Sequence, residues 1–155
     1  MANSIWRWSS GEPPNRVGRT STHYQHRHLA HWTVWDKWDL YDRSIQMYQD
    51  FLPSSIERAK HQGYQGARLG KMSDPSGRSA PGEINSLLIW QQPHSMWFAE
   101  MEYRKSPTAK TIQKWDRVLT EVADFMASYA WYNQSTKVYD LGPRKCSIEI
   151  DFEVR

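Results

Sequence analysis

Glu83 is the residue best placed for acid–base chemistry. It lies near the end of a segment, residues 62–85, that is rich in glycine and proline and leads into a tryptophan-bearing stretch. A long connection between two helices is uncommon in compact domains and is often functional. Burial among aromatic rings raises the pKa of a carboxyl group, as a general acid for glycosidic bond cleavage requires. The alternative is an acidic residue favoured by the dipole at a helix N-terminus.

Four residues that follow Glu83 have the chemistry of a sugar subsite: Trp90, Gln91, Gln92 and His94. Glutamine amides bond to hydroxyl groups, histidine donates or accepts, and an indole ring stacks on the C–H face of a sugar. Trp90 and His94 are also four residues apart, so both could simply face a helical core. We predict that the four contact a carbohydrate substrate.

Two basic residues of the glycine-rich segment, Arg68 and Lys71, could hold a sugar hydroxyl or a phosphate. A solvated pair of cations is the alternative. Asp74 precedes Pro75, which favours a turn over catalysis. The sequence offers no convincing second carboxylate, because Glu100 and Glu102 are expected on helix surfaces.

Other reactive residue types give weaker signals. Four histidines fall within nine residues: His23, His26, His28 and His31. Their spacing does not ensure that the rings converge and no cysteine joins them, so we predict no metal site and no cofactor. Cys146, the single cysteine, excludes an internal disulfide.

Hydrophobic periodicity predicts helices on both sides of the glycine-rich segment. Helical patterning starts near His26, resumes after Trp38, restarts at Pro53 and ends at Gly63. The second of these runs has the stripe Tyr41, Ser44 or Ile45, Tyr48, and Phe51 or Leu52.

Beyond the segment, one helical run spans residues 87–103 and contains Pro93, which kinks it or shifts its start. The clearest helix begins at Ser106, as N-cap, and Pro107. Its apolar stripe is Ile112, Trp115, Val118, Leu119, Val122, Phe125, Met126 and Tyr129. A turn over residues 133–137 and an extended segment over 138–143 follow.

The two ends have a different character. Residues 1–22 lack periodicity and predict an irregular arm, whereas Cys146–Val154 alternates apolar and polar residues as a strand does. A lone strand after helices has no obvious partner. We therefore divide the chain into an arm at 1–22, a helical domain at 23–143 and a separate tail at 144–155.

Composition narrows the class of function. Nine Trp, eight Tyr and four Phe make 14% of the 155 residues aromatic, and such rings recognise sugars or unpaired bases. The net charge of +3 with intermixed signs argues against a nucleic-acid partner. No apolar run approaches the roughly 20 residues of a membrane span, and Met1–Ser10 lacks the pattern of a signal peptide. If the chain is complete, we expect a soluble cytoplasmic protein that does not bind membranes.

The block from His28 to Pro143, about three-quarters of the chain, resembles the six-hairpin glycosidase-like proteins. The matching stretches are His28–Trp32, Gly63–Arg68, Lys71–Glu83 and Leu88–His94, and they are similar to relatives of glycoside hydrolase families 65 and 95. The resemblance implies an all-α fold of antiparallel helical hairpins forming part of an (α/α)6 toroid. It also implies a family acid in the neighbourhood of Glu83.

A complete toroid is much longer than this chain, so the resemblance implies a partial domain. We predict a glycoside hydrolase-like fragment that acts on carbohydrate, with little or no turnover alone. The alternative is a non-catalytic helical module that binds a protein or a glycan. The sugar, its linkage, the stereochemical outcome and the oligomeric state remain open.

Overall fold

The computed structural model describes residues 20–21, 29–79 and 88–141. Its elements in chain order are β1 (Thr20–Ser21), α2 (Trp38–Ile45), α3 (Met47–Asp50), α4 (Leu52–His61), β2 (Met72–Ser73), α6 (His94–Lys105), α7 (Ala109–Tyr129), β3 (Ala130–Asn133) and β4 (Val138–Leu141). A short helical segment over residues 29–34 precedes α2. Strand β1 pairs antiparallel with β2, and β3 pairs antiparallel with β4.

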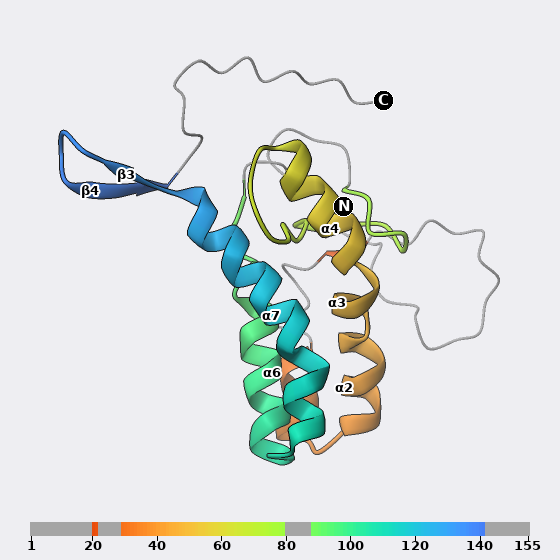
Figure 1. The fold of residues 1–155 in the computed structure, drawn as a ribbon. Helices are drawn as coiled ribbons and strands as arrows, with labels where there is room; N and C mark the ends of the chain where they lie inside the picture. The colour runs from red at the N-terminus through yellow and green to blue at the C-terminus, as the bar shows by residue number, and fades with distance from the viewer. Residues whose placement is uncertain (1–19, 22–28, 80–87, 142–155) are drawn as a thin grey trace.

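Helices α2, α3 and α4 follow one another in a single broken column (Figure 1). The breaks fall at Gln46 and Phe51, and Pro53 lies in the first turn of α4, where the missing N–H costs nothing. In the predicted stripe of this column Ser44 is half-buried, and the other five residues are buried: Tyr41, Ile45, Tyr48, Phe51 and Leu52. The predicted restart at Pro53 is confirmed, and Gly63 follows the end of α4 with a φ of +79°.

Helices α6 and α7 pack against each other as an antiparallel pair (Figure 1). The side chain of Thr108 accepts a hydrogen bond from the Thr111 N–H at 3.2 Å, so Thr108 is the N-cap of α7 and the predicted cap at Ser106 is wrong. Helix α6 starts at His94, directly after Pro93, whereas residues 90–93 form a turn. The proline therefore shifts the start of the predicted helix.

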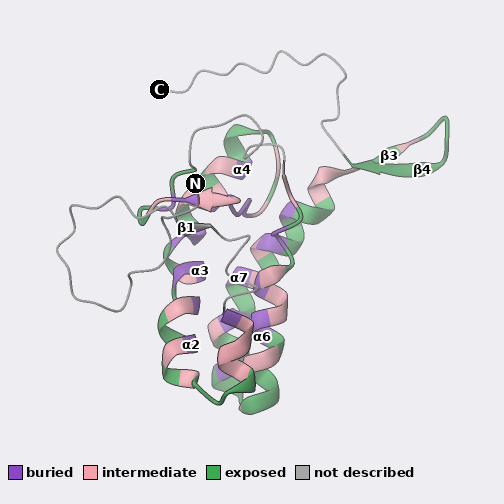
Figure 2. Ribbon diagram, turned by 180° about the vertical axis from the view of Figure 1, so that it is seen from behind, coloured by how far each residue is buried: buried purple, intermediate pink, exposed green. Residues whose placement is uncertain are grey.

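The core lies between the α2–α4 column and the α6–α7 pair (Figure 2). Tyr41 and Tyr48 pack near Phe98, with ring centroids 5.8 Å away in each case, and the Tyr41 hydroxyl donates to the Phe98 carbonyl. Helix α7 contributes the buried residues Trp115, Val118, Val122 and Phe125, as its predicted stripe requires. Ile112 and Met126 of the same stripe are exposed, because they lie at its margins.

The chain after α4 is ordered by contacts with both neighbouring helices. The Ala67 N–H donates to the Glu121 carbonyl of α7 at 2.7 Å, and the Arg68 N–H donates to the Ser55 carbonyl of α4 at 2.9 Å. Gly66, with a φ of +67°, makes this approach possible, because a Cβ there would collide with the backbone of α7. Within its described part, the glycine-rich segment is therefore a fixed connection.

The loop continues through β2 into a tight turn organised by Asp74. Its carboxylate accepts hydrogen bonds from the Ser76 N–H at 2.8 Å, the Ser76 hydroxyl at 2.6 Å and the Arg78 N–H at 3.0 Å. The bond from the Ser76 hydroxyl is the main cause that lowers the pKa of Asp74. The interpretation of Asp74 as a turn residue fits this geometry.

The predicted fold class is wrong. The described chain combines helices with two small antiparallel sheets, and it does not form part of a helical toroid. Three of its helices run in series as one column instead of folding back as hairpins, and the chain after α7 forms a β-hairpin. Helical periodicity identifies which residues are helical, but it does not fix the direction in which successive helices run.

The ends of the chain fall largely outside the described residues. Within the predicted irregular arm, Thr20 and Ser21 form a strand against Ser73 and Met72. The predicted strand at Cys146–Val154 and the tail at 144–155 lie outside the described part. No helix of the described residues is long and apolar enough to cross a membrane.

Candidate functional site

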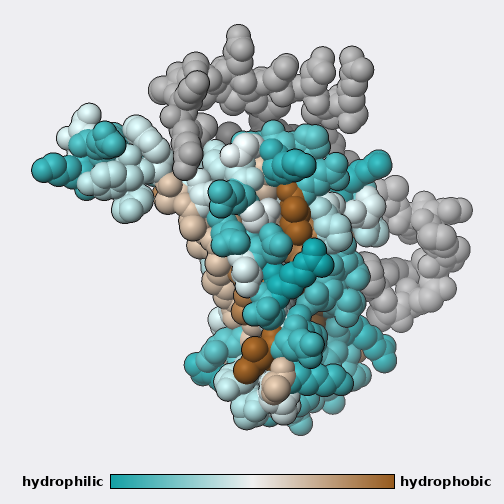
Figure 3. Space-filling model, viewed as in Figure 1, coloured by the Kyte–Doolittle hydropathy of each residue, from teal (hydrophilic) through white to brown (hydrophobic). Residues whose placement is uncertain are grey.

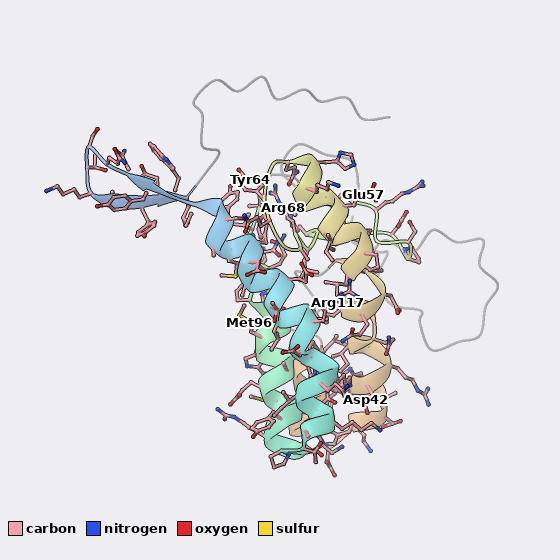
Figure 4. All side chains as sticks on the ribbon, viewed as in Figure 1. Asp42, Glu57, Tyr64, Arg68, Met96 and Arg117 are labelled. Carbon is pink, nitrogen blue, oxygen red and sulfur yellow. The ribbon has the colours of Figure 1, made fainter. Side chains whose placement is uncertain are left out.

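Arg68 lies between α4 and the C-terminal part of α7, close to Tyr64 (Figure 4). It is 6% exposed, and its guanidinium lies 5.7 Å from the Phe125 ring centroid and 6.0 Å from that of Tyr129. It also donates to the side-chain oxygen of Gln62. Burial lowers the pKa of the Arg68 guanidinium. These contacts fasten the loop to α4 and α7 and leave little of the cation facing solvent.

A second arginine, Arg58 of α4, also fixes this loop. Its guanidinium donates to the Arg68 carbonyl at 2.8 Å and to the Gly77 carbonyl at 2.6 Å. Burial, and then the positive charge of Arg68, lower the pKa of Arg58. One side chain therefore holds two points of the loop that are nine residues apart.

Gln92 and Gln91 bind the same loop through its backbone. The Leu69 N–H donates to the Gln92 side-chain oxygen at 3.0 Å, and the Gln92 amide nitrogen donates to the Leu69 carbonyl at 2.8 Å. The Gln91 amide nitrogen donates to the same carbonyl at 3.0 Å and to the Leu88 carbonyl at 2.9 Å. Both glutamines are buried. The whole amide of Gln92 and the amide nitrogen of Gln91 are thus engaged by the protein itself, whereas the Gln91 side-chain oxygen is buried without a hydrogen-bond partner among the described residues.

The remaining predicted residues differ in accessibility. Trp90 is 41% exposed and packs edge-on against His94, with ring centroids 5.8 Å apart. His94 and Lys71 are half-buried. Glu83, the predicted general acid, lies outside the described residues. Gln91 and Gln92 bond to Leu69, the neighbour of Arg68 in the sequence. Of the six described candidates, Trp90 offers the most open surface.

A hollow of about 460 Å³ opens at the other end of the molecule, between α2, α6 and the start of α7. Its lining comprises Trp38 and Asp42 of α2, Glu102 and Lys105 of α6, and Ser106, Thr108, Lys110, Thr111 and Lys114 around the α6–α7 turn. Figure 4 shows Asp42 at this end, far from Arg68. The hollow combines one indole ring with hydroxyl, carboxylate and ammonium groups.

Glu102 is the most enclosed charge of the hollow, with a side chain that is 14% exposed. Lys114 donates to its two carboxylate oxygens at 2.8 and 2.9 Å, and the indole N–H of Trp115 donates at 2.7 Å. Lys114 also lies 3.5 Å from the carboxylate of Asp42. The shared ammonium keeps Glu102 and Asp42 close to each other without leaving two unpaired negative charges.

Trp38 forms the aromatic wall of the hollow. Its ring packs edge-on against Tyr41, with centroids 5.1 Å apart, and the ammonium of Lys105 lies 4.3 Å from its centroid. A cation this close to an indole face is attracted by the ring quadrupole. Lys105 is largely exposed, so a ligand that stacks on Trp38 needs only to displace a flexible side chain.

Sequence reasoning missed this hollow because it assigned Glu102 to a solvated helix surface. The prediction is right for Glu100, which is exposed and pairs with Arg104, and wrong for Glu102. Glu102 lies four residues after the buried Phe98, so helical spacing places both on the inward face. A carboxylate on a buried face needs a partner. The four-residue spacing of Glu102 from Phe98 was therefore the signal in the sequence that Glu102 belongs to a polar site.

The described residues include no group of three or more His, Cys, Asp or Glu side chains that could hold a metal ion. His31 instead packs against Trp32 and Trp35, with centroid distances of 4.2 and 4.9 Å. The other three histidines of the cluster lie outside the described part.

No family model matches the chain, and no curated protein or solved structure shows a significant match to it. The resemblance to six-hairpin glycosidase-like proteins therefore stays a prediction.

Proposed function

We propose that this chain binds carbohydrate, as part of a glycoside hydrolase-like protein, and has little or no turnover alone. The observation that supports binding is the hollow between α2, α6 and α7, where the Trp38 ring faces a set of hydroxyl, carboxylate and ammonium groups. Its volume of about 460 Å³ falls within the size range of small-molecule sites. A sugar needs this combination, because it presents both a C–H face and a ring of hydroxyls.

The charged groups of the hollow suit a polyhydroxylated ligand. Asp42 and Glu102 accept hydrogen bonds from sugar hydroxyls, and Lys105 and Lys110 donate to them. Lys114 and Trp115 hold the Glu102 carboxylate in one orientation, so little side-chain entropy is lost when a ligand binds it. The indole of Trp38 gives the sugar an apolar surface on which to stack.

Catalysis is proposed for Glu83, acting as the general acid in the parent protein. The same proposal includes sugar contacts. Those with accessible surface are Trp90, His94 and Lys71. Sugar contacts by Gln91, Gln92 and Arg68 would compete with the hydrogen bonds that these side chains make to the loop and to Gln62. Hydrolysis also needs a second carboxyl group on the other side of the bond, so we expect negligible activity from the isolated chain.

The first experiment measures binding of the full chain to a panel of methyl glycosides and disaccharides by isothermal titration calorimetry. We expect Trp38→Leu and Asp42→Asn each to weaken binding at least tenfold, equivalent to about 1.4 kcal/mol. Asp50→Asn is the matched control, because Asp50 is an exposed helical carboxylate outside the hollow. Circular dichroism confirms that each variant keeps its helices.

The binding results distinguish the two candidate sugar sites, the hollow with Trp38 and the Trp90–His94 pair. Weaker binding in Trp90→Leu, with unchanged binding in Trp38→Leu, would move the sugar to the Trp90–His94 pair. An absence of binding to every sugar would overturn the proposal. Turnover of aryl glycosides that disappears in Glu83→Gln would support the general acid, whereas turnover unaffected by Glu83→Gln would contradict it.

The non-catalytic interaction module remains a second candidate, and one observation favours it. Strands β3 and β4 carry exposed aromatic and aliphatic side chains at the end of α7. This surface is independent of the hollow.

A further inference from the structure

The hairpin of β3 and β4 extends from the end of α7 away from the helices (Figures 1 and 2). Its register pairs Ala130 with Leu141, Tyr132 with Tyr139, Trp131 with Asp140 and Asn133 with Val138. Paired residues share a face of a sheet, and alternate residues lie on opposite faces. Ala130, Tyr132, Tyr139 and Leu141 therefore form one face, which we call the tyrosine face.

The tyrosine face is apolar and open to solvent. Tyr139 is 70% exposed, Leu141 is 72% exposed and Tyr132 is 45% exposed. The rings of Tyr132 and Tyr139 lie 5.1 Å apart and form a continuous aromatic surface. In Figure 3 the hairpin is coloured pale to teal, because the hydropathy scale gives tyrosine and tryptophan intermediate values and gives the polar residues of the turn low ones. Contiguous exposed apolar side chains of this kind occur at interaction surfaces.

Asp140 is the one charged residue in β3 and β4. A two-stranded hairpin is marginally stable by itself in water, so it gains from a further contact. Its main contact with the rest of the described chain is with α7, through β3.

We propose that the tyrosine face binds the tyrosine face of a second copy of this chain. A two-fold axis brings the same patch of each copy together, so the patch must be compatible with itself. The tyrosine face meets this condition because it carries no charge: Asp140 lies on the opposite face and Lys137 lies in the turn. Phenol hydroxyls can donate and accept across such an interface.

The size of the face sets the strength of the dimer. At about 200 Å² for a tyrosine side chain, the exposed fractions amount to roughly 300–400 Å² per copy. A standard stable interface buries about 800 Å² per partner. The dimer is therefore weak and dissociates on dilution. The hairpin that carries this face extends beyond the helices (Figure 1).

Sedimentation velocity of the full chain over a wide concentration range tests the proposal. We expect a monomer at low concentration that shifts towards a dimer at high concentration. Leu141→Lys on the tyrosine face should raise the dissociation constant at least tenfold. Val138→Lys on the opposite face of β4 and Val34→Lys, far from the hairpin in sequence, are matched controls that place lysine at exposed apolar positions and should leave it unchanged.

A mixture of isotopically labelled and unlabelled protein identifies the face directly. Isotope-filtered nuclear Overhauser effects should connect the Tyr132 or Tyr139 ring of one copy with the Leu141 methyl groups of the other. A chain that stays monomeric at all concentrations would overturn the proposal. So would a dimer that Leu141→Lys leaves intact, or one whose intermolecular contacts lie on another surface.

Discussion

The side-chain amide of Gln92 pairs with the backbone of Leu69 as a neighbouring strand would. Leu69 donates its N–H to the amide oxygen at 3.0 Å, and the amide nitrogen donates to the Leu69 carbonyl at 2.8 Å. Both groups are buried, so water cannot replace these bonds. The pair joins the loop after α4 to the turn before α6, at the two ends of the segment that carries Glu83.

Gln92→Leu should destabilise the protein by about 2–4 kcal/mol, because it leaves the N–H and the carbonyl of Leu69 without the partners that Gln92 supplies. The Leu69 carbonyl keeps its bond from Gln91, which limits the loss. Urea denaturation measures the change. Gln113→Leu, at an exposed position of α7, is the control and should stay within about 0.5 kcal/mol. Equal effects of the two substitutions would contradict the role of the pair.

Gly66→Ala should be far more damaging than Gly63→Ala. Both glycines have a positive φ, of +67° and +79°, so each substitution costs about 1–2 kcal/mol of backbone strain. A Cβ at Gly66 would in addition collide with the Glu121 carbonyl and the Phe125 nitrogen, whereas a Cβ at Gly63 meets nothing within 4 Å. We expect Gly66→Ala to detach the loop from α7. Thermal melts that show equal losses for the two variants would refute this close approach.

Two buried tyrosines offer a test of hydrogen bonding in the core. The Tyr41 hydroxyl donates to the Phe98 carbonyl, whereas the Tyr48 hydroxyl has no hydrogen-bond partner among the described residues. Tyr41→Phe should cost about 1 kcal/mol, and Tyr48→Phe should be neutral or stabilising, since it removes an unsatisfied group. Chemical denaturation of the two variants checks the order. A larger loss for Tyr48→Phe would show that its hydroxyl is bonded.

The same tyrosines predict how stability depends on pH. Burial raises the pKa of Tyr41 and of Tyr48, and the charges of Glu102 and Asp42 add to the effect at Tyr41. The folded state therefore holds both phenol protons at a pH where the unfolded state releases them. Their contribution to the free energy of unfolding is present below about pH 10 and is lost as the pH rises above it.

Phenolate absorbance measures this effect. We expect Tyr41 and Tyr48 to stay protonated at about pH 11 until the protein unfolds, so that part of the absorbance change coincides with loss of helical circular dichroism. Tyr48→Phe should reduce the part that coincides with unfolding. A phenolate titration completed in the folded state would contradict the burial of these rings.

The sequence predicts the helices better than their arrangement. The stripe Trp115, Val118, Val122 and Phe125 is buried as helical spacing requires, and Pro53 restarts a helix. The spacing around Pro93 misplaces the start of α6, because Trp90 continues the apolar rhythm in a turn. Tertiary contacts determine that residues 90–93 form a turn, because side-chain hydrogen bonds hold this turn to a loop about twenty residues earlier in the chain.

The candidate site, like the fold, is predicted by the sequence only in part. Residue types predict that Gln91 and Gln92 form several hydrogen bonds, but not that the partner is Leu69 of the same chain. The hollow depends on Trp38, Glu102 and Lys114, which come from three helices. Their proximity depends on how the column meets the α6–α7 pair, and periodicity carries no information about that packing.

Chemical-shift mapping of the full, isotopically labelled chain tests sugar binding in the hollow most directly. On addition of a sugar that binds, we predict shifts of the Trp38 indole N–H and of the backbone amides of Thr108 and Thr111. The amides of Gly77 and of β4, which lie outside the lining of the hollow, should not move. Shifts at Trp90 and His94 without shifts at Trp38, or no shift with any sugar of the panel, would contradict sugar binding in the hollow.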